Sequence, residues 1–258
     1  MADDITYSHV ILEWHFTPAD FFGGPVTATR EGYTWSLEDG KAEARIDGLQ
    51  YAADEVVREK IHQELESRFR AAQVLRHQPF ELSGSTVIKV RPDGTRAISM
   101  ELRAGAITIT GHRPSVRITD PAGNVVYDSE QASREETRAF ENRVVGHSTD
   151  PLLGVLLRSF QAAVRDPDNE LVHLYELRDA LATRFGGDRE AKAALGVSAK
   201  NWGRFGLLCN GEPLRQGRHR GENAGSLRDA TEAELVEART FGKKLLDSYL
   251  DVLDSESP

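Results

Sequence analysis

The chain has 258 residues, of which 39% are hydrophobic and 28% are charged, a composition typical of globular proteins rather than of disordered or membrane-embedded ones. A formal net charge of −9 at pH 7 disfavours non-specific binding to duplex nucleic acid or to anionic membranes, so any phosphate site has to be a local basic patch. The sequence also contains no apolar run long enough to predict a membrane-spanning helix.

The single cysteine, Cys209, excludes an intramolecular disulfide and a cysteine-based zinc site. It follows Leu207 and Leu208 in a predicted helix, which favours a small buried residue over a reactive thiol. The acidic start Met-Ala-Asp-Asp lacks the basic and apolar segments of a secretion signal. We therefore expect a cytoplasmic protein that does not insert into membranes, and no motif in the sequence calls for a metal or another cofactor.

The N-terminal half alternates short β-prone segments with turn sequences. Turns such as Glu38-Asp39-Gly40 join consecutive segments, which is typical of a β-meander. Between residues 52 and 76 apolar residues recur every three or four positions, and this period predicts one long amphipathic helix that Pro79 closes. We expect an antiparallel sheet of about seven or eight strands packed with this helix. The segments with strand character, from which this sheet is expected to form, are residues 7–16, 26–30, 33–37, 41–46, 86–91, 96–102, 106–110, 116–119 and 124–127.

The strand signals stop after residue 130, and helical periodicity takes over. Ser133 with Glu136, and Thr231 with Glu234, are capping boxes that predict helix starts, and Asp150 is expected to cap the helix that follows it. The fold class is therefore α+β, with a β-rich domain over residues 1–130 and an all-α domain over residues 131–258. The predicted helices of the second domain are residues 133–145, 151–165, 167–185, 188–195, 198–209 and 231–253.

The densest cluster of chemically active side chains lies in a loop rich in Gly, Arg and Asn before the last helix. Its central residues are Arg215-Gln216-Gly217-Arg218-His219-Arg220-Gly221. Arginine binds phosphate oxygens with a forked set of donors, glycine lets a backbone approach a ligand, and histidine transfers protons near neutral pH. In metal-independent RNA cleavage His219 would deprotonate a 2′-hydroxyl or protonate the leaving oxygen, while Arg215 would stabilise the charge that builds on phosphorus. Equally open is a solvated basic loop that docks on an acidic face of the same chain or of a partner subunit.

Residues 150–253 resemble the HEPN superfamily, especially its bacterial ApeA-like members, through the helix at 171–185, Asn210, the segment from Arg215 to His219, and the long helix after it. The resemblance implies a helical bundle that cleaves RNA as a homodimer, in toxins or in phage defence. Arg215 and His219 would then be catalytic, and Arg218 and Arg220 would bind phosphate. Other members have lost activity, so the resemblance also allows a non-catalytic structural or regulatory module that binds a protein partner within a larger assembly.

Residues 193–204 resemble the core of a helix-turn-helix, with a short helix, a Leu-Gly-Val-Ser turn and a capped second helix. In a DNA-binding regulator the second helix would offer Lys200 and Asn201 to base edges, with Arg204 beside them. The structural interpretation of the same residues is two short helices joined by a turn, with Trp202 and Phe205 in the core.

Two further groups contain side chains that bind metals elsewhere. His173 and Glu176 lie one helical turn apart, and His9, Glu13 and His15 share one face of a predicted strand because all three have odd numbers. Solvated polar faces account for both groups, so we predict no metal site.

Overall fold

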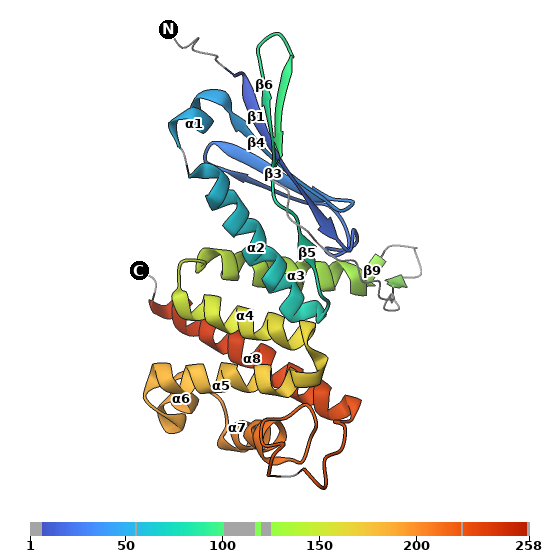
Figure 1. The fold of residues 1–258 in the computed structure, drawn as a ribbon, viewed down its shortest axis with the longest axis vertical. Helices are drawn as coiled ribbons and strands as arrows, with labels where there is room; N and C mark the ends of the chain where they lie inside the picture. Colours follow the sequence, from blue (N-terminus) through green and yellow to red (C-terminus); the bar gives the residue numbers. More distant parts are fainter. Residues whose placement is uncertain (1–6, 55, 101–116, 120–124, 223, 257–258) are drawn as a thin grey trace. The chain divides into compact units, whose positions relative to one another are not determined.

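The computed structural model describes residues 7–54, 56–100, 117–119, 125–222 and 224–256. These residues form an antiparallel sheet in the N-terminal part and helices in the C-terminal half, as the sequence predicted (Figure 1). The chain divides into two compact units, a first unit of Met1–Phe69 with Phe80–Arg138 and a second unit of Arg70–Pro79 with Ala139–Pro258. Unlike the expected ranges 1–130 and 131–258, this division assigns residues 70–79 to the second unit and residues 131–138 to the first.

The main sheet of the first unit has seven strands in the part of the chain that is described, in the order β2-β3-β4-β1-β6-β7, with β5 also paired to β1. Each pairing in it is antiparallel. Strands β8 and β9 form a separate two-stranded sheet, and the predicted strand at 106–110 lies outside the described residues. The strands are β1 (His9–Thr17), β2 (Val26–Arg30), β3 (Tyr33–Glu38), β4 (Lys41–Asp47), β5 (Glu81–Leu82), β6 (Thr86–Val90), β7 (Arg96–Met100), β8 (Arg117–Thr119) and β9 (Val125–Asp128).

Alternation of apolar residues along β1 places Val10, Leu12, Trp14 and Phe16 on one buried face of the sheet. Helix α2 (Val57–Arg76) packs on this face, where the ring of Phe69 lies 5.1 Å from that of Phe16. The apolar face of β1 and the apolar face of α2 therefore share one core, as the sequence predicted.

The prediction of one helix from residue 52 to residue 76 is wrong at its start. The structure has a short helix α1 (Gly48–Ala53) that ends at Asp54, and α2 begins at Val57. Asp54 adopts an extended backbone, and its carboxylate accepts hydrogen bonds from the Val56 amide at 3.1 Å and from Lys60 Nζ at 2.8 Å. An aspartate that bonds to nearby groups in this way offers the chain an alternative to a continuous helix.

A buried carboxylate on α2 holds the helix to the sheet. Glu64 is 9% exposed and accepts hydrogen bonds from Arg30 Nη2 at 2.7 Å, Tyr33 Oη at 3.0 Å and Trp35 Nε1 at 3.2 Å, with Arg68 Nη2 at 3.3 Å. Burial of the phenol, together with the charge of Glu64, raises the pKa of Tyr33 to about 12. Because several donors satisfy the carboxylate, its burial is compatible with a stable core.

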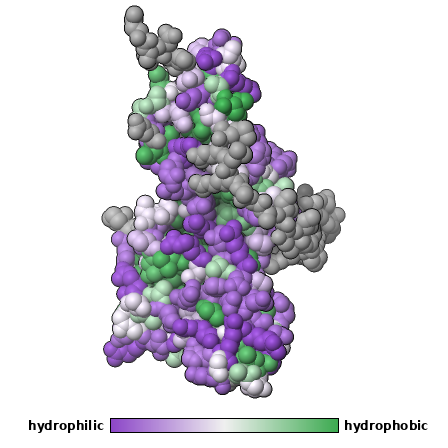
Figure 2. Space-filling view, viewed as in Figure 1, coloured by the Kyte–Doolittle hydropathy of each residue, from purple (hydrophilic) through white to green (hydrophobic). Residues whose placement is uncertain are grey.

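The C-terminal half is helical, and among the described helices none combines the length and the apolar composition that a membrane span needs. On the face shown in Figure 2, hydrophilic residues predominate and hydrophobic ones form only small patches. The elements are α3 (Ser129–Gly146), α4 (Pro151–Arg165), the 3-10 turn η1 (Pro167–Asn169), α5 (Glu170–Phe185), α6 (Asp188–Ala194), α7 (Ala199–Gly206), the π-helical turn η2 (Leu207–Gly211) and α8 (Glu232–Glu256).

Two predicted helix caps are confirmed and one is wrong. Asp150 accepts a hydrogen bond from the Leu153 amide at 2.6 Å, and the Thr231 and Glu234 side chains each accept one from the other residue's amide, at 3.3 and 2.8 Å. Helix α3, however, begins at Ser129, so Ser133 lies inside it and does not cap it. The intervening Glu, Gln and Ala residues are strong helix formers, which carry the helix back towards β9.

Helices α4, α5 and α8 share one hydrophobic core in the second unit. Gly242 on α8 lies where a Cβ atom would be 3.3 Å from Leu174 Cδ2 and 3.5 Å from Phe160 Cε2. The glycine thus allows close approach to α4 and α5, which offsets its low helix propensity.

Candidate functional site

The loop before α8, which we call the Arg/His loop (residues 212–231), is held by backbone hydrogen bonds. Arg215 N donates to Arg228 O at 2.9 Å, and Arg228 N donates to Pro213 O at 3.0 Å. Gln216 connects the loop to the two helices beside it, since its carbonyl accepts from the Val172 amide of α5 at 3.2 Å and its side chain accepts from the Ala230 amide before α8 at 3.0 Å. An amide of the first turn of α5, which has no partner within its own helix, is thereby satisfied.

The loop also packs on the turn η2, in which Leu208 and Cys209 are buried. Arg218 N donates to Cys209 O at 3.1 Å, and a Cβ atom on Gly217 would lie 3.3 Å from that same oxygen and from Leu214 O. Gly217 therefore allows close backbone approach inside the loop. The Cys209 side chain is buried, and burial raises the pKa of its thiol, which confirms the prediction of a packing residue.

Arg218 is bound to α5. Its Nη1 lies 2.9 Å from Asp179 Oδ2, and its guanidinium lies 4.6 Å from the centre of the Tyr175 ring. Arg178 contacts the same tyrosine, donating to its hydroxyl at 2.6 Å, and lies 5.1 Å from the centre of the Trp202 indole. These cation–π contacts join the loop, α5 and α7, and they assign Arg218 a structural role.

Arg220 is also engaged within the chain. Its Nε donates to Gly217 O at 2.9 Å, and its Nη2 donates to Asp168 O at 3.1 Å and to Asn169 Oδ1 at 2.5 Å. A guanidinium with three oxygen partners in the loop and in η1 is a brace for the loop.

Arg215 and His219 have weaker partners. Arg215 Nε lies 3.7 Å from Asp229 Oδ1, and these side chains are 63% and 76% exposed. His219 Nδ1 lies 3.1 Å from Glu222 Oε1, and these side chains are 43% and 75% exposed. Ion pairs between solvated groups stabilise by only about 0–1 kcal/mol, so a bound phosphate can displace these carboxylates at little cost.

The predicted helix-turn-helix residues lie in a different environment. Helices α6 and α7 and the turn between them form as expected, and Ser198 caps α7 by accepting from the Asn201 amide at 3.2 Å. Lys200 and Asn201 are exposed on α7. Arg204, in contrast, donates to both carboxylate oxygens of Glu237 on α8, at 3.1 and 3.0 Å. That carboxylate offsets the positive charge of Arg204, so the geometry gives base recognition by α7 little support.

A buried ionic cluster in the second unit was not predicted. Glu170, at the start of α5, has a side chain that is 2% exposed, and it accepts from Arg239 Nε at 2.6 Å and from Arg239 Nη2 at 2.8 Å. His77 Nε2 lies 3.3 Å from the same carboxylate. The three residues come from distant segments, and no local sequence pattern connects them.

The spacing of Arg215 and His219 recurs at Arg143 and His147, where the structure shows its consequence. On a helix this spacing brings both side chains to one face. Arg143 Nε and His147 Nε2 lie 2.9 and 2.6 Å from the carboxylate of Asp254 on α8. Hydrogen bonding to His147, together with Arg143, lowers the pKa of Asp254. The pair of Arg143 and His147 therefore helps to pack α3 on α8.

The polar groups considered as metal ligands have other partners. His173 Nε2 lies 3.2 Å from Asp166 Oδ2, and Glu176 accepts from Ser159 at 3.0 Å. On β1, Glu13 is bound by Lys41 Nζ at 3.0 Å, so an ammonium ion neutralises the carboxylate. Across the ranges described, no group of three or more His, Cys, Asp or Glu side chains is arranged to hold a metal ion.

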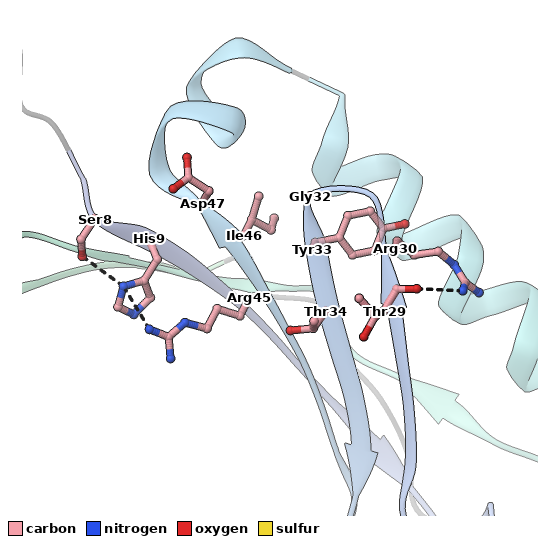
Figure 3. A pocket seen from close by; sticks show the side chains of 10 residues that line it. All are labelled: Ser8, His9, Thr29, Arg30, Gly32, Tyr33, Thr34, Arg45, Ile46 and Asp47. Carbon is pink, nitrogen blue, oxygen red and sulfur yellow. Dashed lines mark hydrogen bonds between the residues drawn. The ribbon is translucent and has the colours of Figure 1, made fainter.

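A depression of about 650 Å³ lies in the first unit, at the end of the sheet where β1, β3 and β4 meet (Figure 3). His9 Nδ1 lies there 3.0 Å from Ser8 Oγ and 3.5 Å from Arg45 Nη2. Burial and then the charges of Arg45 and Arg96 lower the pKa of His9, which favours the neutral imidazole. The one acidic side chain of its lining, Asp47, is committed to capping α1.

Comparisons with protein-family models, with curated proteins and with solved structures find no match to this chain. A functional assignment therefore has to come from the residues of the site and from their geometry.

Proposed function

We propose that the two units are two domains, and that the C-terminal domain is a HEPN-like module that binds RNA phosphates through Arg215 and His219 and cleaves RNA without a metal ion. The basic side chains of the Arg/His loop differ in their partners, and this difference supports the proposal. Arg218 and Arg220 bind oxygens of α5 and η1 and thereby order the loop. The ion pairs of Arg215 with Asp229 and of His219 with Glu222 are solvent-exposed, so a phosphate can replace these carboxylates.

In the proposed reaction the imidazole of His219 takes the proton of a 2′-hydroxyl, and the 2′-oxygen forms a bond to phosphorus. The bond from phosphorus to the 5′-oxygen breaks, and that oxygen takes a proton from solvent. The products are a 2′,3′-cyclic phosphate and a 5′-hydroxyl. Arg215 stabilises the charge on the phosphoryl oxygens as the phosphorus becomes five-coordinate.

The test is cleavage of a mixed-sequence single-stranded RNA by the full chain in EDTA. We expect His219→Ala to lower the rate by about 100-fold or more, as for loss of a general acid or base. Arg189→Ala is the control for a surface substitution in the same domain, because Arg189 is 90% exposed on α6 and lies outside the Arg/His loop. Equal rates for wild type and His219→Ala would refute the catalytic role.

RNA binding is measured separately from cleavage, with a 2′-deoxy strand that has no attacking hydroxyl. The logarithm of the binding constant should fall with the logarithm of salt concentration by about 0.7 for each phosphate contact on a single strand. Arg215→Ala should reduce this slope by about that amount, while Arg189→Ala leaves it unchanged. A slope that does not change in Arg215→Ala removes this residue from the interface.

A non-catalytic module that binds an acidic protein is the second candidate. One observation favours it. Each of the four basic side chains of the loop lies against an oxygen of this chain, and carboxylates of a partner protein could bind them in the same way; the four are Arg215, Arg218, His219 and Arg220. Absence of cleavage and of RNA binding, in a protein whose fold is intact, is the outcome that would favour this candidate.

A further inference from the structure

A cavity of about 300 Å³ lies in the second unit between α7, η2 and α8. It does not involve Arg215, Arg218, His219 or Arg220, so it is independent of the proposed RNA site. Its volume is at the lower end of the range for pockets that hold small molecules. The lining residues are Asn201, Arg204, Phe205, Leu208, Glu237, Thr240, Phe241 and Lys244.

The floor of this cavity is apolar. Phe205, Leu208 and Phe241 are at most 9% exposed, and the rings of the two phenylalanines lie 4.9 Å apart. Leu208 belongs to the π-helical turn η2. π-helical turns are rare overall, but many of those that occur lie at functional sites, because they shift side chains out of regular helical register.

The rim is polar, and its side chains have hydrogen-bonding partners within the described chain at only one end. Arg204 donates hydrogen bonds to both carboxylate oxygens of Glu237, so its charge is neutralised within the wall. Lys244, two turns along α8 from Glu237, is exposed and forms no ion pair with any described residue. The side chains of Asn201 and Thr240 likewise form no hydrogen bond within the described chain.

We propose that this cavity binds a small amphipathic monocarboxylate, with its hydrocarbon part on Phe205, Leu208 and Phe241. Its carboxylate contacts the Lys244 ammonium and accepts hydrogen bonds from Asn201 and Thr240. A single ammonium matches one negative charge. A phosphate dianion fits less well, because the only guanidinium of the lining is already bound to Glu237 and does not balance a second negative charge.

The test is calorimetric titration of the full chain with octanoate, and with 1-octanol as the uncharged probe of the same length. Lys244→Met keeps most of the apolar stem and removes the charge. We expect this variant to bind octanoate about tenfold more weakly, the loss typical of a hydrogen bond to a charged group, and to bind 1-octanol unchanged. Lys200→Met is the matched control, since Lys200 is an exposed lysine of α7 that does not line the cavity.

A second variant, Thr240→Trp, fills the cavity from its exposed rim without replacing a buried residue. It should abolish binding of both probes while circular dichroism remains that of the wild type. The proposal is overturned if octanoate does not bind the wild type at millimolar concentration. It is equally overturned if octanoate binds Lys244→Met as tightly as wild type, or if it still binds Thr240→Trp.

Discussion

Replacing Arg239 with methionine tests whether the buried cluster around Glu170 holds the second unit together. Arg239 contributes two short hydrogen bonds to a carboxylate whose side chain is 2% exposed. The substitution retains much of the apolar stem of the side chain but leaves the carboxylate buried with His77 as its one remaining partner among the described residues. A buried charge that has lost its partner is far less stable in the folded chain than in water.

The expected loss follows from this burial. Removing one partner of a buried ion pair typically destabilises a protein by about 3–5 kcal/mol. Because the Arg239 side chain is itself 23% exposed, water can approach the carboxylate from that side, and we expect about 3 kcal/mol. The neighbouring pair of Arg239 with Glu232 adds little, because Glu232 is 74% exposed.

Urea denaturation followed by far-UV circular dichroism measures this loss. Arg189→Met serves as control and should change the free energy of unfolding by no more than about 0.5 kcal/mol. The double variant Glu170→Leu/Arg239→Met, which removes both charges, should recover most of the loss, because an apolar pair of similar volume is about as stable as a buried ion pair. A loss below about 1 kcal/mol in Arg239→Met would refute the reasoning from burial.

Three further predictions concern single side chains. The hydrogen bond from Arg228 lowers the pKa of Glu234 to about 2, so its contribution to stability is present above the usual carboxyl pKa and is lost as pH falls through about 2. Acid unfolding should therefore depend less steeply on pH between these values in Glu234→Gln, and an equal dependence would contradict the assignment. Spectrophotometric titration should show one tyrosine that ionises near pH 12 and disappears in Tyr33→Phe. Asp150→Ala should destabilise by about 1–2 kcal/mol in urea, because the cap of α4 is lost, whereas Asp150→Asn should retain most of that stability.

Most secondary structure could be predicted because it depends on local patterns. Strands β2, β3 and β4 appear within one residue of their predicted bounds, and helix α4 has the predicted bounds. The errors are also local in origin. Strand β5 has two residues, too few for any alternation to show, and Asp54 interrupts a helical period that continues on both sides of it.

The candidate site was located by composition, but the roles of its residues were not. The sequence places Arg215, Arg218, His219 and Arg220 together because they are neighbours in the chain. It cannot distinguish the arginines that brace the loop from the arginine that has only an exposed partner, since Asp179 and Asn169 are brought to them by folding. Similarly, Arg204 is a free cation in the sequence and a partner of Glu237 in the structure.

The sequence by itself determined the hydrophobic period of each segment, several of the helix caps and the position of the basic loop in an acidic chain. These features depend on residues within a few positions of one another. Only the tertiary structure decided that His77, Glu170 and Arg239 share a buried cluster and that Lys244 borders an apolar cavity with Asn201. Such contacts form where the packing of whole helices brings distant residues together, and a local pattern carries no information about that packing.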